Sequence, residues 1–301
     1  MKYKKRLNIM LMAFPIMYIA VLLAGCKKSV NIEQRVDELY NKNVMLCGEN
    51  RDRQGLKLPG RQQQFVEELL ATGKPVVLVV FGGRAQVISD IADRCAAVIQ
   101  AWYPGEEGGH AVADILYGKV SPSGKLSVSY PKTEVYEPLC YNYSAEPDPR
   151  VQWPFGYGLS YTTFEYSDLN VEGDFSTASP SINLSFVLKN TGKVTADEIA
   201  QVYLSPTSSN QPLRPIQLQG FARVSLNPGE SKTVKIKLYT EQFGYYSHEG
   251  QRQWNIAPGS YIVKVGASSA DIRLQQTVAL NGDPVTKPLR QYYFSETLID
   301  Q

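Results

Sequence analysis

The stretch Val76-Val77-Leu78-Val79-Val80-Phe81 decides the fold of the first half of the chain. It is a continuous run of β-branched and other apolar residues, which is typical of a strand covered on both faces, as in a parallel sheet. Gly82-Gly83 ends the run. A second apolar run at Ala96–Trp102 predicts another buried strand beside it.

Helical patterns flank both predicted strands. Apolar residues at helical spacing predict a helix over residues 62–71, and Gly73 stops it. We expect a second helix over 85–94, between the strands, and a third from about His110 to Tyr117. The order helix–strand–helix–strand–helix indicates an α/β layer with right-handed crossovers.

The second half of the chain has the texture of an all-β sandwich. Alternate apolar residues between 182 and 188 predict a half-buried strand, and further strands are expected at 199–204, 233–238 and 261–265. Turn sequences containing Gly separate these segments. The expected organisation is an α/β domain at 44–135, a linker rich in Pro, Tyr and Gly at 136–165, a sandwich at 166–280 and a tail at 281–301.

The N-terminus is typical of an export signal. Basic residues precede an apolar stretch that runs from about Leu7 to Leu23, and Leu23-Ala24-Gly25-Cys26 resembles a bacterial lipobox. We therefore expect residues 1–26 to be a lipoprotein signal peptide, with Cys26 lipidated. The protein is then held by its lipid in the bacterial cell envelope, periplasmic or at the outer membrane. The alternative is a plain signal anchor with a chance cysteine.

The composition excludes several function classes. The 301 residues carry a formal net charge of +2, which is too balanced to favour nucleic acid as a partner. His110 and His248 are the two histidines and have no partners at ligand spacing, so we expect neither a metal site nor a cofactor. The cysteines show neither zinc spacing nor a disulfide framework.

Gly48–Arg53 and Leu56–Gln62 form two consecutive motifs. They resemble the acid/base loop, and the helix after it, of glycoside hydrolase family 3, the family of many β-glucosidases. Gln100–Gly109 and Pro122–Leu126 continue the match, and Pro154–Phe164 resembles the family's entry to its terminal domain. The resemblance implies the family's C-terminal α/β lobe, followed by a fibronectin type III-like domain.

The resemblance also implies that a domain is missing. Residues 27–43 form a short linker in which Asn31–Tyr40 resembles the start of the family's N-terminal barrel, although a chance match stays open. A (β/α)₈ barrel needs about 250 residues. The chain passes from Tyr40 to the second lobe at Val44 with no room for one, as an internal deletion would leave it.

Retaining glycosidases need two carboxyl groups about 5–5.5 Å apart, one as nucleophile and one as acid/base. The resemblance implies an aspartate nucleophile on the barrel and Glu49 as the acid/base. A general acid must stay protonated, which takes a desolvated pocket or a neighbouring negative charge. Without the barrel, Glu49 is expected to be solvated, ionised and a poor acid. The alternative is a loop carboxylate paired with Arg51 or Arg53.

Three further residues are candidates for substrate binding: Asp52, Arg53 and Trp102. Asp52 and Arg53 also fit an internal ion pair that shapes the loop. Trp102 opens a segment suited to lining a sugar site. The glycines of that segment, at 105, 108 and 109, are better explained by a tight turn between strand and helix.

These observations leave three functional hypotheses. The first is a hydrolase of β-glucosides or related saccharides that works only when a separate chain supplies the barrel. The second is a lipid-anchored, carbohydrate-associated remnant without catalysis. The third is a deletion product without a selected function.

Overall fold

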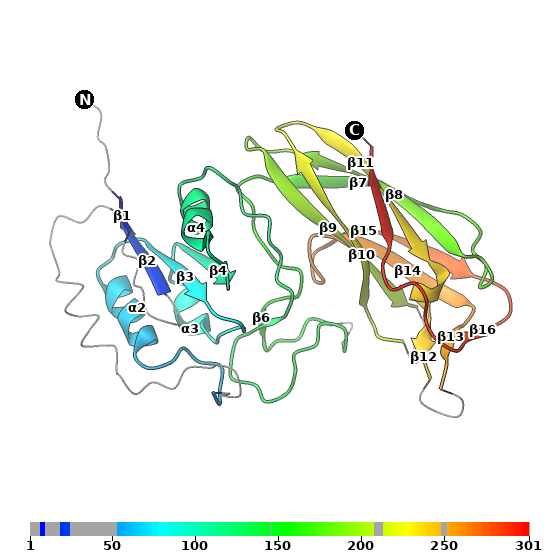
Figure 1. Cartoon of the computed structure of the whole chain (residues 1–301), viewed down its shortest axis with the longest axis horizontal. Coiled ribbons are helices and arrows are strands. Elements are labelled where there is room, and N and C mark those ends of the chain that lie inside the picture. Colours follow the sequence, from blue (N-terminus) through cyan, green and yellow to red (C-terminus); the bar gives the residue numbers. More distant parts are fainter. Residues whose placement is uncertain are drawn as a thin grey trace. The chain divides into compact units, whose positions relative to one another are not determined.

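The structure is a computed structural model that describes residues 53–144, 146–207, 213–247 and 252–300, with the backbone of 7–9 and 19–24. The chain forms two compact units. The first, the α/β lobe, comprises the chain up to Ala113 with Tyr130–Leu139 and Arg150–Gln152. The second, the sandwich, comprises Asp114–Ser129, Cys140–Pro149 and the chain from Trp153 onward. The expected fold class, an α/β layer followed by an all-β sandwich, is confirmed (Figure 1).

The sheet of the α/β lobe has the order β1-β2-β3-β4. The predicted strands are β3 (Val76–Phe81) and β4 (Ala97–Trp102), which pair in parallel. On the other side, β2 (Ile19–Ala24) pairs antiparallel with β3 and with β1 (Leu7–Ile9). The apolar run of β3 is buried, as its composition predicts.

Two expectations about this lobe are wrong. The strand β4 is half-buried rather than buried, because it is the edge strand of the sheet. The helix expected over 85–94 is confined to α3 (Ser89–Ala92). The chain before it is used for a tertiary contact, since Val87 N–H donates to the Leu56 carbonyl at 2.8 Å.

The other two helices lie close to their predicted positions. Helix α2 spans Gln62–Ala71, as predicted, and buries Val66 and Leu69. Helix α4 spans Gly108–Leu116 and is largely half-exposed. In the described part of the chain, no helix is both long and apolar enough to cross a membrane.

The sandwich consists of two four-stranded antiparallel sheets (Figure 1). One sheet has the order β10-β9-β14-β15 and the other β17-β11-β8-β7. Their strands are β7 (Phe164–Glu172), β8 (Ser181–Asn190), β9 (Ala196–Pro206), β10 (Gln217–Leu226), β11 (Ser231–Tyr239), β14 (Gly259–Gly266), β15 (Ile272–Leu280) and β17 (Glu296–Ile299).

The core between these sheets follows the predicted alternation. The apolar residues of β8 from Ile182 to Leu188 are at most 1% exposed, while the residues between them point away from the core. Side chains from both sheets complete one continuous apolar cluster. This unit therefore has a full core of its own.

Short strands complete the chain. In the range expected to be a linker, β6 (Val151–Trp153) pairs with β5 (Tyr130–Pro131). A three-stranded sheet joins β12 (Tyr245–Tyr246), β13 (Trp254–Ile256) and β16 (Val285–Lys287), and a 3-10 helix, η1, spans Thr240–Phe243. The range 281–301 therefore contributes two strands, β16 and β17.

Candidate functional site

The candidate site lies at the carboxyl ends of β3 and β4, where α/β sheets commonly place their ligands. Gly82 N–H donates to the Trp102 carbonyl at 3.2 Å and joins the two strand ends. The side chain of Gln100 contributes a longer contact to the Gly82 carbonyl, at 3.4 Å. Tyr130 in turn donates its hydroxyl to Gln100 Oε1 at 2.9 Å. Burial raises the pKa of Tyr130 to about 12, so this hydroxyl stays protonated and acts as a donor.

A loop described from Arg53 onward is fixed against this edge by Arg84. Nη2 of Arg84 donates to the carbonyls of Arg53 and Gly55, each at 3.0 Å. The Glu134 carboxylate accepts the Leu56 N–H at 3.0 Å. Gln86, which is buried, donates its amide N–H groups to the carbonyls of Leu56 at 3.0 Å and Lys57 at 3.2 Å.

Glu49 and Asp52 lie outside the described residues. Three residues lie between Glu49 and Arg53, so the Cα atoms of the two are at most about 14 Å apart.

Arg53 has a structural role in the described part of the loop. Its guanidinium donates to the Lys57 carbonyl, and its own carbonyl accepts from Arg84. These bonds join the two ends of the described loop. The contact of Arg53 with substrate stays a prediction.

Trp102 has a backbone conformation that is unusual for a residue with a side chain. Its φ of 52° is positive, and the register of β3 and β4 shifts at this position. Such strain persists where the surrounding structure imposes it, and it is common at functional sites. This is consistent with the expected place of Trp102 at the edge of a sugar site.

The glycines after Trp102 are explained by the turn. Gly105 has a φ of +76°, which favours glycine. A Cβ at Gly108 would lie 2.5 Å from the Pro104 ring. The structural interpretation of these two glycines is therefore confirmed.

The motifs at 122–126 and 154–164 meet within the sandwich unit and have structural roles there. The ammonium of Lys125 pairs with Glu198 at 3.0 Å, and the two side chains are only 11% and 5% exposed. Tyr166 donates its hydroxyl to the same carboxylate at 2.9 Å. A Cβ at Gly158 would come within 2.3 Å of the Gly124 carbonyl oxygen. These residues hold two loops together in a buried network.

Sequence reasoning missed Arg84, Gln86, Gln100 and Glu134. Each acts on residues that lie far away in the sequence, so local patterns contained no signal for Arg84 or Glu134. Gln100 could have been identified, because a polar residue within an apolar strand run needs a hydrogen-bond partner. In the residues that the structure describes, no cluster of three or more His, Cys, Asp or Glu side chains suits a metal ion.

Comparison with known proteins agrees with this architecture. Residues 20–161 match the glycosyl hydrolase family 3 C-terminal domain, and residues 198–269 match the fibronectin type III-like domain. A β-glucosidase from Kluyveromyces marxianus is 38% identical over 83% of this chain and 33% of its own length. A β-xylosidase from Formosa agariphila is 36% identical over 74% of this chain and 32% of its own length.

Solved structures also match this chain over part of their own length. The crystal structure of the Kluyveromyces marxianus β-glucosidase matches with a TM-score of 0.71 at 34% identity, covering 79% of this chain and 30% of that one. The Listeria innocua β-glucosidase, solved in complex with glucose, matches with a TM-score of 0.70 at 32% identity, covering 78% and 35%. The chain thus spans about a third of the length of these relatives. It belongs to glycoside hydrolase family 3, of which it carries the C-terminal α/β lobe followed by the fibronectin type III-like domain.

Proposed function

We propose that this chain supplies the acid/base side of a β-glucosidase-type active site, with Glu49 as the acid/base. The observation that carries the proposal is the loop after Glu49, which Arg84 and Glu134 hold against the carboxyl edge of the sheet. Relatives with this lobe include β-glucosidases and a β-xylosidase, so β-glucosides and related saccharides are the proposed substrates.

The proposed reaction has two steps. A carboxylate nucleophile attacks the anomeric carbon, while Glu49 gives its proton to the departing glycosidic oxygen. Water then attacks the glycosyl-enzyme ester, loses its proton to Glu49 and releases the sugar and the free carboxylate. The nucleophile is proposed to come from a family 3 barrel on a separate chain. The same barrel would desolvate Glu49 and keep it protonated.

The test is hydrolysis of an aryl β-glucoside by the purified chain, with and without a separately produced barrel of a family 3 β-glucosidase. We expect no turnover by the chain alone and turnover by the mixture. Glu49→Gln should lower that turnover by about 10²–10⁴-fold. Glu165→Gln, at an exposed position on β7, should leave it unchanged.

Three outcomes would contradict parts of this proposal. Turnover by this chain alone, lost on Glu49→Gln, would show that it needs no second chain. Turnover by the mixture that survives Glu49→Gln would remove the acid/base assignment. An inactive mixture, with both chains folded, would favour the non-catalytic hypothesis.

We also propose that the mature protein is lipid-anchored in the cell envelope through Cys26, in which case processing before Cys26 removes β1 and β2 from the sheet of the lobe. The basic N-terminus, the apolar stretch and the Leu-Ala-Gly-Cys sequence support this. Labelled fatty acid should enter the wild-type protein and not Cys26→Ala, whereas Cys140→Ala should still be labelled. Equal labelling of wild type and Cys26→Ala would refute the anchor.

A further inference from the structure

The last part of the sandwich unit holds a group of aromatic side chains on its surface. After β16, residues 288–295 cross to β17, which pairs with β11. The crossing segment includes Tyr292, Tyr293 and Phe294, which are 43%, 60% and 84% exposed. Three consecutive aromatic residues that all reach solvent are unusual for a segment without a binding role.

A buried carboxylate fixes this segment in place. Glu241, in η1, has a side chain that is only 3% exposed. It accepts hydrogen bonds from the Gln291 N–H at 2.6 Å, from the Tyr292 N–H at 3.1 Å and from the ammonium of Lys287. Burial opposes ionisation, but Lys287 and the two N–H groups outweigh it, and the pKa of Glu241 lies below its usual value.

Ring contacts order the side chains themselves. The Tyr292 ring stacks on Tyr239 with centroids 3.9 Å apart and planes 4° from parallel. The guanidinium of Arg290 lies 5.2 Å from the ring centroids of both Trp254 and Tyr293. The entropy of ordering the side chains of Trp254, Tyr292 and Tyr293 is therefore already lost in part before any ligand binds.

We name these residues the aromatic strip: Tyr246, Trp254, Arg290, Tyr292, Tyr293 and Phe294. Tyr246 belongs to it because it pairs with Trp254 across the β12–β13 register and is 37% exposed. Residues directly opposite one another on paired strands present their side chains to the same face.

The charges around the strip favour a neutral ligand. Lys287 is paired with Glu241, and Lys237 is paired with Glu296 at 3.4 Å. Arg290 is half-covered by two rings and directs Nε to the Tyr292 carbonyl at 2.7 Å. An anionic polymer or a phospholipid surface would need cations that are not already neutralised.

A polysaccharide matches this combination of groups. The faces of sugar rings present C–H groups that pack on flat aromatic rings, and their hydroxyls bond to nearby polar groups. We propose that the aromatic strip binds a neutral β-linked glucan chain, at a site distinct from the loop that carries Glu49. The choice of a glycan rests on the proposed function, but the binding itself requires no catalysis.

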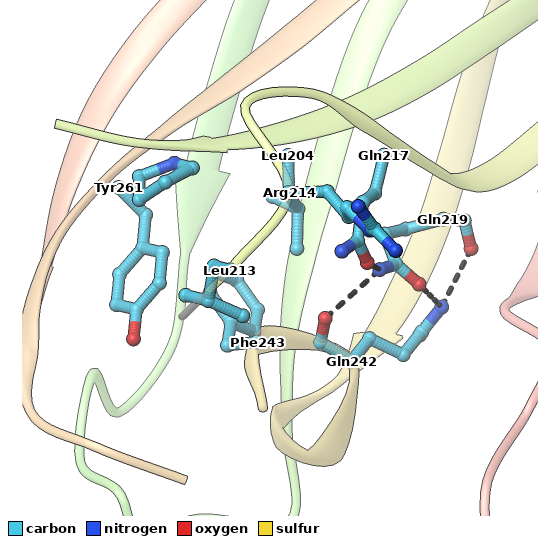
Figure 2. Close-up of a pocket in the computed structure, with 9 residues that line it drawn as sticks. Leu204, Leu213, Arg214, Gln217, Gln219, Gln242, Phe243 and Tyr261 are labelled. Atoms are coloured by element: carbon cyan, nitrogen blue, oxygen red, sulfur yellow. Dashed lines mark hydrogen bonds between the residues drawn. The ribbon is translucent and has the colours of Figure 1, made fainter. Parts of the chain in front are cut away.

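A pocket in the same unit is a weaker candidate. It is lined by residues that include Arg214, Gln219, Gln242 and Phe243 (Figure 2). Gln219 and Gln242 satisfy one another through reciprocal hydrogen bonds of their amides to backbone carbonyls. Its cavity volume of about 10 Å³ leaves room for no more than about one water molecule, far below the volume of typical ligand sites.

The test is affinity electrophoresis of the full chain in native gels that contain a soluble mixed-linkage β-glucan. The wild type should be retarded, and Tyr293→Ala/Phe294→Ala should lose at least about ten-fold in apparent affinity, as expected for the loss of two stacking rings. Tyr293→Phe should retain binding. The matched control is Tyr136→Ala/Leu159→Ala, at positions 99% and 70% exposed, which should bind as the wild type does.

The outcomes separate this inference from the proposed function. Glu49→Gln should be retarded like the wild type even where it abolishes hydrolysis. Unretarded wild-type protein, or equal retardation of the Tyr293→Ala/Phe294→Ala variant, would overturn the inference. So would a change from dimer to monomer in that variant on ultracentrifugation, because the strip would then be a contact between copies.

Discussion

The α/β lobe and the sandwich differ in how completely they bury their apolar residues. In the sandwich, both sheets contribute to one continuous core, and β8 places every second side chain in it. Among the strands of the lobe whose side chains are described, β3 is buried in this way, while β4 is half-exposed at the edge of the sheet. Parallel sheets are normally covered on both faces. The comparison predicts that the sandwich, with its own continuous core, is the more stable unit of the two.

The largest expected effect is on the sandwich core. Phe186 is fully buried, so Phe186→Ala should cost about 3–5 kcal/mol of the free energy of unfolding of this unit. In denaturant, we expect two transitions, with the lobe unfolding first, and only the second should move. Val98→Ala, at a half-exposed position on β4, should cost less than about 1 kcal/mol and affect only the first transition. A single cooperative transition would contradict the comparison.

The next effect concerns the ion pair of Lys125 and Glu198. Glu198→Gln leaves the ammonium buried without its partner and should destabilise the sandwich by about 3 kcal/mol. Lys125→Met/Glu198→Leu removes both charges and should recover much of that loss. Thermal unfolding of the single and double variants measures the difference. A double variant as unstable as the single one would show that the pair is needed for more than mutual neutralisation.

A smaller effect is expected from Glu241, and it depends on pH. Its pKa is lowered in the folded protein, so its contribution is complete above the unfolded value of about 4.3 and is lost as pH falls through the folded pKa. Glu241→Gln should therefore lower the free energy of unfolding of the sandwich by about 1–3 kcal/mol at neutral pH, and by little in acid. Hydrogen exchange of the Gln291 and Tyr292 amides, measured as a function of pH, reports this loss of stability. Glu165→Gln should leave these amides protected.

The smallest expected effect is local to the lobe. Arg84→Ala removes two hydrogen bonds to the carbonyls of Arg53 and Gly55 and should lower the free energy of local opening of this loop by about 1–2 kcal/mol. We expect faster proteolysis within residues 44–57, with little change in the first unfolding transition. Arg94→Ala, at an exposed position, is the control. Unchanged cleavage in Arg84→Ala would show that the loop is held by other contacts.

Sequence patterns predicted the elements whose burial is regular. The period of Gln62–Ala71 matches α2, and the alternation from Ile182 to Leu188 matches β8, because in both cases one face packs on a core. The helix over 85–94 was overestimated, since pairing of Val87 with Leu56 outweighed its local preference. The edge position of β4 was also unpredictable, because it depends on which strands come next in the sheet.

The candidate site was predicted only in part. Trp102 was chosen from its motif, and its role in substrate binding stays a prediction, although its φ of 52° marks an unusual backbone position. The bonds of Arg84 and Glu134 to the loop were not predictable, since they join residues about 30 and 78 positions apart. Such contacts depend on the tertiary fold and leave no period in the sequence.

The buried ammonium of Lys125 has a consequence for the evolution of this module. Lys125 lies within the segment that matches the α/β family domain, yet its charge is neutralised inside the sandwich. A recombination point placed after residue 161 would give the host protein a β-sandwich with an uncompensated carboxylate in its interior. Transfer of this fibronectin-like module between genes should therefore succeed only when the short stretch around Lys125 moves with it.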